Sequence, residues 1–466
     1  PWRKKVEAIL HMDRACTPTA LCSFIGAVNY YRDMWPSRSH ILQPLTDKSG
    51  LKKKDKLNWT DKMQIAFDKM KKLMTATAAA ALLAGSAFAG GHNEVKIGVI
   101  LGFTGPLETI TPAMGAGAEL AMKEVTDSGK LLGGATVTSV RADSTCIDAA
   151  AATAAAERLV TSDKVNAIMG ADCSGVTGAI LQNVARPNGI VMISPSATSP
   201  ALSTAEDDGL FFRTSPSDAR QGVVMTNIIM DRGFKTVALT YTNNDYGKGL
   251  ADSFAAAFEA AGGTVTINAA HDEDKADYSA EVGALASAGG DLLVVAGYES
   301  GGGKQIIQAS LDTGAFDTFV LPDGMVGQAI VDAIGPDLNG SFGQYPGSEN
   351  KGADVFGGLA SAAGFEGSSA FAGESYDAAA LIMLAMQAGG SSASADVMQH
   401  VMNVANAPGV QIMPGQLGQA LVLLEAGYDI DYVGATAVEL IGPGESAGNY
   451  REIEIQNAKV ETVGYR

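Results

Sequence analysis

Short apolar runs alternate with longer amphipathic stretches over most of the chain from residue 95 onward. Strands are predicted at 95–101, 136–140, 166–170, 190–194, 236–241, 264–268 and 291–296. Helices are predicted at 112–126, 148–160, 174–184 and 246–261. Short apolar strands that alternate with helices of ~10–15 residues are typical of parallel sheets with helices on both faces. The pattern therefore predicts an α/β body with doubly wound parallel sheets.

The strand–helix pattern occurs twice, and its first set ends near residues 213–218. Two such lobes joined by a hinge place the carboxyl ends of their parallel strands on a shared cleft, where ligands bind. We expect lobe 1 to contain residues 90–215 and about 341–430. Lobe 2 then contains residues 216–340 and about 431–466.

A different pattern occupies residues 70–89. Met70, Lys71 and Lys72 precede an apolar run over 73–84, which leads to Ala87-Phe88-Ala89. A basic start, a short apolar middle and a small-residue site are typical of a secretory signal peptide, here cleaved after Ala89. The apolar run is shorter than the ~20 residues that span a bilayer. The alternative is an Ala-rich helix within a globular domain.

The position of this segment divides the chain into two parts. A signal peptide belongs at an N-terminus, so we expect Met70 to be the natural start of a secreted protein. Residues 1–69 are then foreign sequence joined in front of it. Pro1 is not an initiator residue, which indicates that the chain begins within a reading frame.

The sign of the net charge changes at the same point in the chain. Hydrophobic residues make up 46% of the chain, which excludes a mainly disordered protein, and the net charge is −18. Residues 1–73 hold fifteen Lys/Arg against seven Asp/Glu, a net charge of +8, which leaves −26 for the rest. Because an acidic body repels phosphate backbones, nucleic acid is not an expected partner of residues 74–466.

Four runs in the first segment carry a resemblance: residues 21–32 (LCSFIGAVNYYR), 44–46, 59–60 and 64–73. This stretch resembles the thumb and connection region of gypsy-type retroelement reverse transcriptases. The resemblance implies a mostly helical, poorly packed remnant without polymerase or nuclease activity, because the family's catalytic carboxylates belong outside the matching region. Weak contact between its basic residues and a phosphate backbone is the alternative to a solvated fragment.

Cysteine use agrees with secretion. The body has only Cys146 and Cys173, which are 27 positions apart and each follow a predicted strand. A pair in a secreted domain is a good candidate for a disulfide. Two buried free thiols are the alternative. Cys16 and Cys22 belong to the first segment.

Hydroxyl and acidic side chains follow the predicted strands of both lobes. Residues 193–200 (ISPSATSP) come after one strand, and Ser174 lies at the strand-to-helix turn before it. Helix N-termini and hydroxyls suit a carboxylate. In the second lobe, Tyr246, Tyr298 and Asp323 each follow a strand or a strand-like run. An acidic side chain opposite a carboxylate site is the arrangement that a zwitterionic α-amino acid requires.

Several motifs in this order carry a second resemblance, which spans about residues 92–466. They are GFTGP at 102–106, the Cys146/Cys173 pair, SPSAT at 194–198, DYG at 245–247, GY at 297–298, PDG at 322–324, ESYDA at 374–378, GA at 434–435 and the strand region at 444–455. The body resembles the leucine/isoleucine/valine-binding proteins, the type I periplasmic solute-binding proteins of ABC importers.

The resemblance implies a role for each candidate residue. Ser174, Ser196, Ala197 and Thr198 would hold the ligand carboxylate, with backbone N–H groups contributing. Asp323 would pair with the α-ammonium, helped by the Ser196 carbonyl and by Tyr246 or Tyr298. Both tyrosines would close the second lobe over the ligand. The side-chain pocket would be bordered by Phe103, Leu107 and Glu108.

Each candidate also has a purely structural interpretation. Ser174 is a suitable helix cap, and residues 196–198 and Asp323 suit turns. Tyr298 suits a core position. A binding pocket for a branched aliphatic side chain is expected to have apolar walls. Here Glu108 and Thr109 follow Leu107, and Glu299 follows Tyr298, so polar residues occupy these positions. This leaves a polar amino acid or an amide open as the ligand.

An enzyme is the least favoured function. The body lacks G-x-G-x-x-G after its first strand, a P-loop and G-x-S-x-G, and its histidines, His92, His271 and His400, are scattered. We therefore expect a monomeric periplasmic solute-binding protein that closes at a hinge, delivers an amino acid to an inner-membrane ABC permease, and needs no cofactor or metal. The alternative is an extracellular ligand-sensing domain of the same fold.

Overall fold

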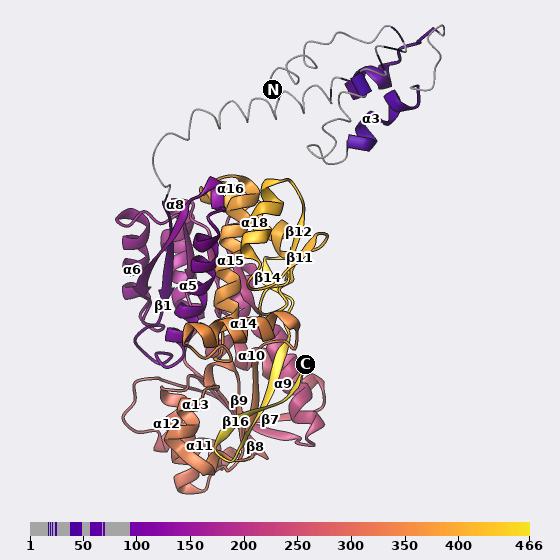
Figure 1. Cartoon of the computed structure of the whole chain (residues 1–466). Helices are drawn as coiled ribbons and strands as arrows, with labels where there is room; N and C mark the ends of the chain where they lie inside the picture. Colours follow the sequence, from indigo (N-terminus) through magenta and orange to yellow (C-terminus); the bar gives the residue numbers. More distant parts are fainter. Residues whose placement is uncertain are drawn as a thin grey trace. The chain divides into compact units, whose positions relative to one another are not determined.

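The computed structural model describes Thr17, Thr19, Leu21, Phe24, Ile25, residues 38–48 and 56–67, Lys69, and all of 94–466. The chain divides into two compact units, one with the first segment and one with the α/β body (Figure 1). The expected start at Met70 and the expected cleavage site at Ala89 lie outside the described residues.

The described part of the first segment is helical at α3 (Arg38–Thr46) and at residues 61–67. Six of its described apolar side chains are buried: Leu21, Phe24, Leu42, Leu45, Met63 and Phe67. The ring centroids of Phe24 and Phe67 lie 4.6 Å apart.

The first sheet of the body has seven strands in the order β13-β14-β5-β4-β3-β1-β2. All neighbours are parallel except β13 and β14. The strands are β1 (Glu94–Leu101), β2 (Thr136–Asp143), β3 (Ala167–Gly170), β4 (Met192–Ser194), β5 (Phe211–Pro216), β13 (Leu440–Ile441) and β14 (Glu445–Ser446).

The second sheet also has seven strands, in the order β16-β15-β10-β9-β8-β6-β7, with β15 and β16 antiparallel to their neighbours. The strands are β6 (Thr236–Thr242), β7 (Thr264–His271), β8 (Leu292–Ala296), β9 (Phe319–Leu321), β10 (Phe342–Pro346), β15 (Tyr450–Gln456) and β16 (Lys459–Tyr465). A small parallel pair, β11 (Val410–Ile412) and β12 (Ile430–Tyr432), completes the strands of the body.

Helices cover both sheets. In the first lobe they are α5 (Thr111–Ser128), α6 (Ala149–Thr161), α7 (Ser174–Ile180), α8 (Arg186–Asn188), α14 (Lys351–Ala363), α15 (Ala372–Gly389), α16 (Ser394–Val397), α17 (Val401–Ala405) and α18 (Leu417–Glu425). In the second lobe they are α9 (Asp218–Asp231), α10 (Asp245–Ala260), α11 (Ser279–Ala288), α12 (Gly302–Thr313) and α13 (Gln328–Ile334). The doubly wound α/β prediction is confirmed.

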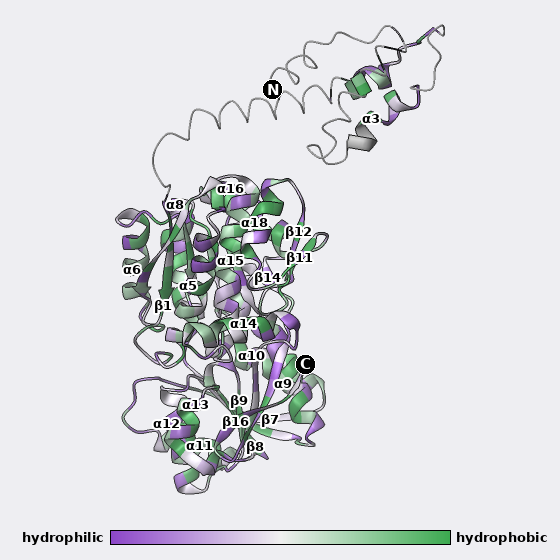
Figure 2. Cartoon of the chain, viewed as in Figure 1, coloured by the Kyte–Doolittle hydropathy of each residue, from purple (hydrophilic) through white to green (hydrophobic). Residues whose placement is uncertain are grey.

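Hydropathy follows this layering. Figure 2 shows β1 as hydrophobic, whereas the outer helices α11 and α12 mix hydrophobic and hydrophilic residues. All residues of β8 are buried, as expected for a central parallel strand. In the part of the chain that the structure describes, no helix is both long and apolar enough to cross a membrane.

The chain crosses between the two sheets three times. It crosses after β5, after β10, and between β14 and β15. The last two crossings differ from the expected lobe limits near 341 and 431. The third is displaced because β14 pairs with β5, where Glu445 lies opposite Arg213 and forms an ion pair with it. This contact between residues far apart in sequence has no local signal.

Helix α15 buries two carboxyl groups in its first two turns. Glu374 is 3% exposed and Asp377 is fully buried. Burial raises the pKa of Glu374 to about 8. Burial also raises the pKa of Asp377 to about 6, although Tyr432, Ala435 and Thr436 donate hydrogen bonds to its carboxylate.

We expect Glu374→Gln to flatten the dependence of stability on pH. Between its ordinary pKa and about 8, folded Glu374 holds a proton that the unfolded chain releases. The free energy of unfolding therefore falls as pH rises, by at most ~1.4 kcal/mol per pH unit. Urea unfolding from pH 5 to 8 measures the slope. Exposed Glu425→Gln is the control, and equal slopes in Glu374→Gln and the original chain would contradict the assignment.

Candidate functional site

Residues from both lobes line one small cavity in the body. Its lining is Leu107, Asp172, Cys173, Ser174, Ser196, Tyr246, Tyr298, Asp323, Gly324 and Phe371. The structure thus brings together five of the seven predicted ligand-binding residues and one of the three predicted pocket residues. The cavity measures about 20 Å³, which is the space of one water molecule. A larger ligand requires the lobes to separate.

The hydroxyl-rich turn after β4 forms the first-lobe wall. Ser194 Oγ donates to the Ala171 carbonyl at 2.5 Å and accepts from the Ala197 N–H at 2.9 Å. Ser196 Oγ donates to the Asp172 carbonyl at 2.9 Å. Ser174, the first residue of α7, accepts from the Ser199 N–H at 3.0 Å. These bonds fix two hydroxyls beside the first, unpaired N–H groups of a helix, a combination that suits a carboxylate.

Four predicted site residues do not line this cavity. Ala197 and Thr198 are buried behind the turn, where the Ala197 carbonyl accepts from Arg213 and the Thr198 carbonyl accepts from the Asp218 N–H. Phe103 packs against the Arg141 guanidinium at 5.0 Å, and Glu108 is exposed. Small polar turns carry no sequence signal for which side chains face inward.

Asp323 forms the second-lobe wall together with two tyrosines. It is 2% exposed, and its Oδ1 accepts from the Tyr246 hydroxyl at 2.6 Å and from the Gly324 N–H at 2.9 Å. The rings of Tyr246 and Tyr298 stack with centroids 5.3 Å apart. Burial raises the pKa of Asp323, and the two hydrogen bonds oppose that increase. The wall thus presents a buried carboxyl group and two aromatic faces.

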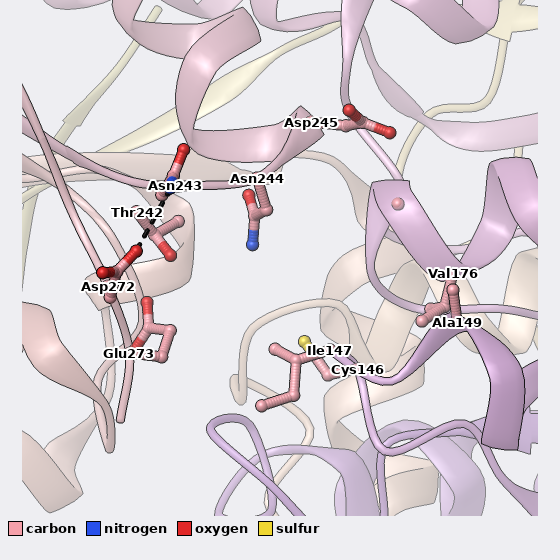
Figure 3. Close-up of a pocket in the computed structure, with 11 residues that line it drawn as sticks. Cys146, Ile147, Ala149, Val176, Thr242, Asn243, Asn244, Asp245, Asp272 and Glu273 are labelled. Carbon is pink, nitrogen blue, oxygen red and sulfur yellow. Dashed lines mark hydrogen bonds between the residues drawn. The ribbon is translucent and has the colours of Figure 1, made fainter. Parts of the chain in front are cut away.

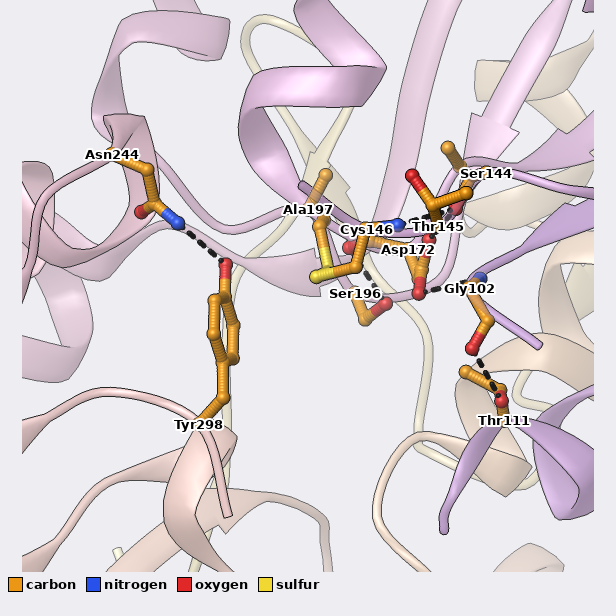
Figure 4. Close-up of a disulfide and its surroundings, with 12 residues drawn as sticks. Gly102, Thr111, Ser144, Thr145, Cys146, Asp172, Ser196, Ala197, Asn244 and Tyr298 are labelled. Atoms are coloured by element: carbon orange, nitrogen blue, oxygen red, sulfur yellow. Dashed lines mark hydrogen bonds between the residues drawn. A yellow bond between two sulfur atoms is a disulfide. The ribbon is translucent and has the colours of Figure 1, made fainter. Parts of the chain in front are cut away.

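A disulfide joins Cys146 to Cys173, with the Cα atoms 5.1 Å apart, as predicted (Figure 4). Beside it, Asp172 is buried and accepts from Ser144 Oγ at 2.7 Å and from the Gly102 N–H at 2.8 Å. Across the cleft, Asn244 donates to the Tyr298 hydroxyl at 3.2 Å. The bridge holds the turn before α7 against the loop after β2.

Sequence reasoning missed two residues that shape the site. Buried Arg213 donates to the Ala197 and Ser199 carbonyls, each at 2.9 Å, and so anchors the hydroxyl-rich turn. Phe371 lines the cavity from the residue before α15. Phe371 is a lone large aromatic side chain between small residues, which is a weak signal, and Arg213 has a visible role only in the folded chain.

A second, larger cavity of about 340 Å³ lies next to the disulfide. Figure 3 shows Thr242, Asn243, Asp272 and Glu273 opposite Cys146 and Ile147. Burial raises the pKa of Glu273. The acidic lining favours cationic groups near this opening.

A hydrogen bond between side chains of the two lobes lies beside the cleft. Thr109 Oγ1, in the first lobe, donates to Glu299 in the second. Glu299 is 2% exposed, and its burial raises the pKa of its carboxyl group. Both residues also line a third cavity of about 490 Å³ between the lobes. The bond joins the two lobes directly.

Comparison with known proteins gives matches to the body. Residues 94–417 match the family described as periplasmic binding protein. The Leu/Ile/Val-binding protein homolog 3 of Brucella melitensis is 33% identical over 234 residues, which is 50% of this chain and 61% of that protein. The match to this chain thus spans less than two thirds of that relative's length. The Leu/Ile/Val-binding protein BraC3 of Rhizobium johnstonii is 32% identical over 267 residues, or 57% of this chain and 71% of that protein.

Solved structures share the fold. A leucine-binding protein from Thermotoga maritima gives a TM-score of 0.68 at 22% identity, covering 80% of this chain and 98% of its own. A branched-chain amino acid transporter substrate-binding protein from Streptococcus pneumoniae gives a TM-score of 0.66 at 23% identity. The match covers 80% of this chain and 99% of that protein. The chain therefore belongs to the periplasmic binding protein family, and its two seven-stranded lobes form the type I fold of that family.

Proposed function

We propose that the body is the amino-acid-binding component of an ABC importer. The observation that carries this proposal is the convergence of opposite chemistry on one cavity. Ser174 and Ser196 suit a carboxylate on one wall, and Asp323 suits an ammonium group on the other. Two relatives named as Leu/Ile/Val-binding proteins support it. So does a Pseudomonas aeruginosa relative, 30% identical, named as binding leucine, isoleucine, valine, threonine and alanine.

Binding would proceed by hinge closure. The ligand enters while the lobes are apart, the three crossings bend, and the closed form docks with a membrane permease. Export to the periplasm would use residues 70–89 as a signal peptide, and the body would act as a monomer without a cofactor. Leu107 and Phe371 favour an aliphatic side chain, whereas Glu299 near the cleft favours a polar amino acid or an amide.

A sensing role is the second candidate. A Halobacterium salinarum relative is 29% identical over 321 residues and is named as a substrate-binding protein of a chemotactic signal transduction system. The same closed form would then dock with a receptor in place of a permease. An uptake assay with labelled amino acid in cells that lack this protein separates the two roles, since only the importer component is required for uptake.

Thermal-shift screening of the full chain against the twenty amino acids, benzoate and succinate tests the proposed binding. We expect stabilisation by one or a few amino acids and by neither acid, because the second wall carries a carboxyl group. A chain that is stabilised by no amino acid would overturn the proposal.

Thr109→Val is expected to speed ligand dissociation. The substitution removes the hydrogen bond to Glu299 that ties the lobes together. Loss of one such bond weakens affinity by about threefold to tenfold. Surface plasmon resonance with immobilised chain measures the dissociation rate. Thr153→Val, which removes a hydroxyl bonded within α6, is the control, and an unchanged rate in Thr109→Val would show that the bond does not hold the closed form.

For the first segment we propose a foreign origin, as a retroelement remnant joined before Met70. The change in charge and the four matching runs support it. Long-read sequencing of the source gene and mass spectrometry of the native protein test this proposal. One uninterrupted reading frame together with the fused protein would contradict it.

A further inference from the structure

A fourth cavity, of about 160 Å³, lies where two of the three crossings between the lobes run side by side. Residues 346–348, where the crossing after β10 begins, line it, and the Gly347 N–H donates to the Asn449 carbonyl of the last crossing at 3.0 Å. Lobe 1 contributes residues of α14 and α15, and lobe 2 contributes Tyr345 and Arg451. We call this cavity the hinge pocket. A molecule bound in it contacts both lobes and a segment that joins them.

Glu374, in the first turn of α15, lines the hinge pocket and is only 3% exposed. Among the described residues, only the main-chain N–H of Glu374 itself donates toward its carboxyl group. The carboxylate oxygen that this N–H does not reach is not enclosed by protein atoms, so it faces the pocket that Glu374 lines. A buried carboxyl group without a partner from another residue is a costly feature, which a bound donor group relieves.

Arg451, in β15, lines the same pocket from the other lobe. One of its terminal nitrogens donates to the Tyr345 hydroxyl at 2.9 Å, and its guanidinium lies 5.3 Å from the Tyr345 ring centroid. Its Nε is buried and has no hydrogen-bond partner. Arg451 acts electrostatically on Glu374 but forms no ion pair with it or with any other described carboxylate. A guanidinium and a carboxyl group thus line one cavity without contacting each other.

The rest of the lining limits what the pocket can hold. Glu366 also lines it, but this residue is exposed and its carboxylate accepts from the Ser368 N–H and hydroxyl, at 3.0 and 2.8 Å. The rings of Phe356 and Phe371 supply apolar surface. A protein cavity of ~150 Å³ holds a molecule the size of benzene. The hinge pocket therefore has room for a ligand of a few heavy atoms with a small apolar part.

We propose that the hinge pocket is a second binding site, which takes a small α-amino acid independently of the ligand in the cleft. The ammonium group of this amino acid lies against Glu374, and its carboxylate lies against Arg451. Each of the two side chains then gains the charged partner that the protein does not supply. A molecule with only one of the two charges satisfies only one of them. The inference goes beyond the proposed function, because it concerns a different cavity.

Equilibrium dialysis of the full chain with labelled L-alanine at pH 8 counts the bound molecules. Gly357 lines the pocket from α14, and a side chain added there meets open space, so Gly357→Leu fills the pocket. Gly358→Leu is the matched control, because Gly358 is the next residue of the same helix, is exposed and does not line the pocket. We expect Gly357→Leu and Glu374→Gln to bind one molecule fewer per chain than the original chain and Gly358→Leu. Unlabelled glycine should displace that molecule, whereas acetate and methylammonium should not.

Three results would overturn the second site. They are equal counts in Gly357→Leu and Gly358→Leu, an original chain that binds no L-alanine, and displacement by acetate or methylammonium as effective as that by glycine. Both leucine variants replace a helical glycine, which does not weaken α14. Asp323→Ala reports on the cleft alone, because Asp323 does not line the hinge pocket. Failure of the second site therefore leaves the proposed function intact.

Discussion

Asp323→Ala is expected to weaken amino-acid binding by about 30-fold to 1000-fold, or ~2–4 kcal/mol. Asp323 is the carboxyl group that lines the cavity opposite the serine turn, and it is only 2% exposed. Without it, the ligand's ammonium group is removed from water and has no charged partner. The substitution therefore costs affinity and leaves the two sheets unaffected.

Titration calorimetry at pH 8 with the amino acid selected by thermal shift measures this loss. Asp337→Ala, an exposed substitution in the same lobe, is the matched control and should retain full affinity. Tyr246→Phe removes the hydroxyl that donates to Asp323 and should have a smaller effect in the same direction. An affinity for Asp323→Ala within twofold of the original would remove Asp323 from the site.

Loss of the disulfide is expected to lower the free energy of unfolding by ~3–4 kcal/mol. The bridge between Cys146 and Cys173 closes a loop with a sequence separation of 27 and holds the turn that carries Ser174. Replacing both cysteines with serine opens that loop in the unfolded chain and increases its entropy. Affinity should fall as well, because Cys173 lines the cavity.

Urea unfolding of the double Ser variant measures the loss of stability, and dithiothreitol treatment of the original chain should reproduce it. Serine substitution at Cys16 and Cys22, in the first segment, is the control. Equal unfolding midpoints for the original body and the Cys146/Cys173 variant would show that the bridge contributes nothing to stability.

Many strands and helices are predictable because each has its own apolar period, whereas α15 is buried over almost all its residues and has none. Each predicted strand and helix is present, with differences at the ends, such as β7, which extends to His271. The crossings were less predictable. Nothing in residues 440–446 indicates pairing with β5, because that pairing depends on Arg213, more than two hundred residues earlier.

The candidate site was also predictable only where a residue has a local sequence signal. Ser174, Ser196 and Asp323 were predictable because each follows a strand and carries chemistry that suits a zwitterion. Asp218 has an equally plain local interpretation as the first residue of a helix after Ser217, which caps it. Only tertiary packing buries its carboxyl group completely. Residues whose surroundings arise only on folding have no motif of their own.

The three crossings also affect how the protein is made. Strand β14 of the first sheet and strands β15 and β16 of the second follow every other strand of the body in the chain. Neither sheet has all its strands until residues 445–465 have left the ribosome. Both lobes therefore complete their sheets only after these late strands have been synthesised.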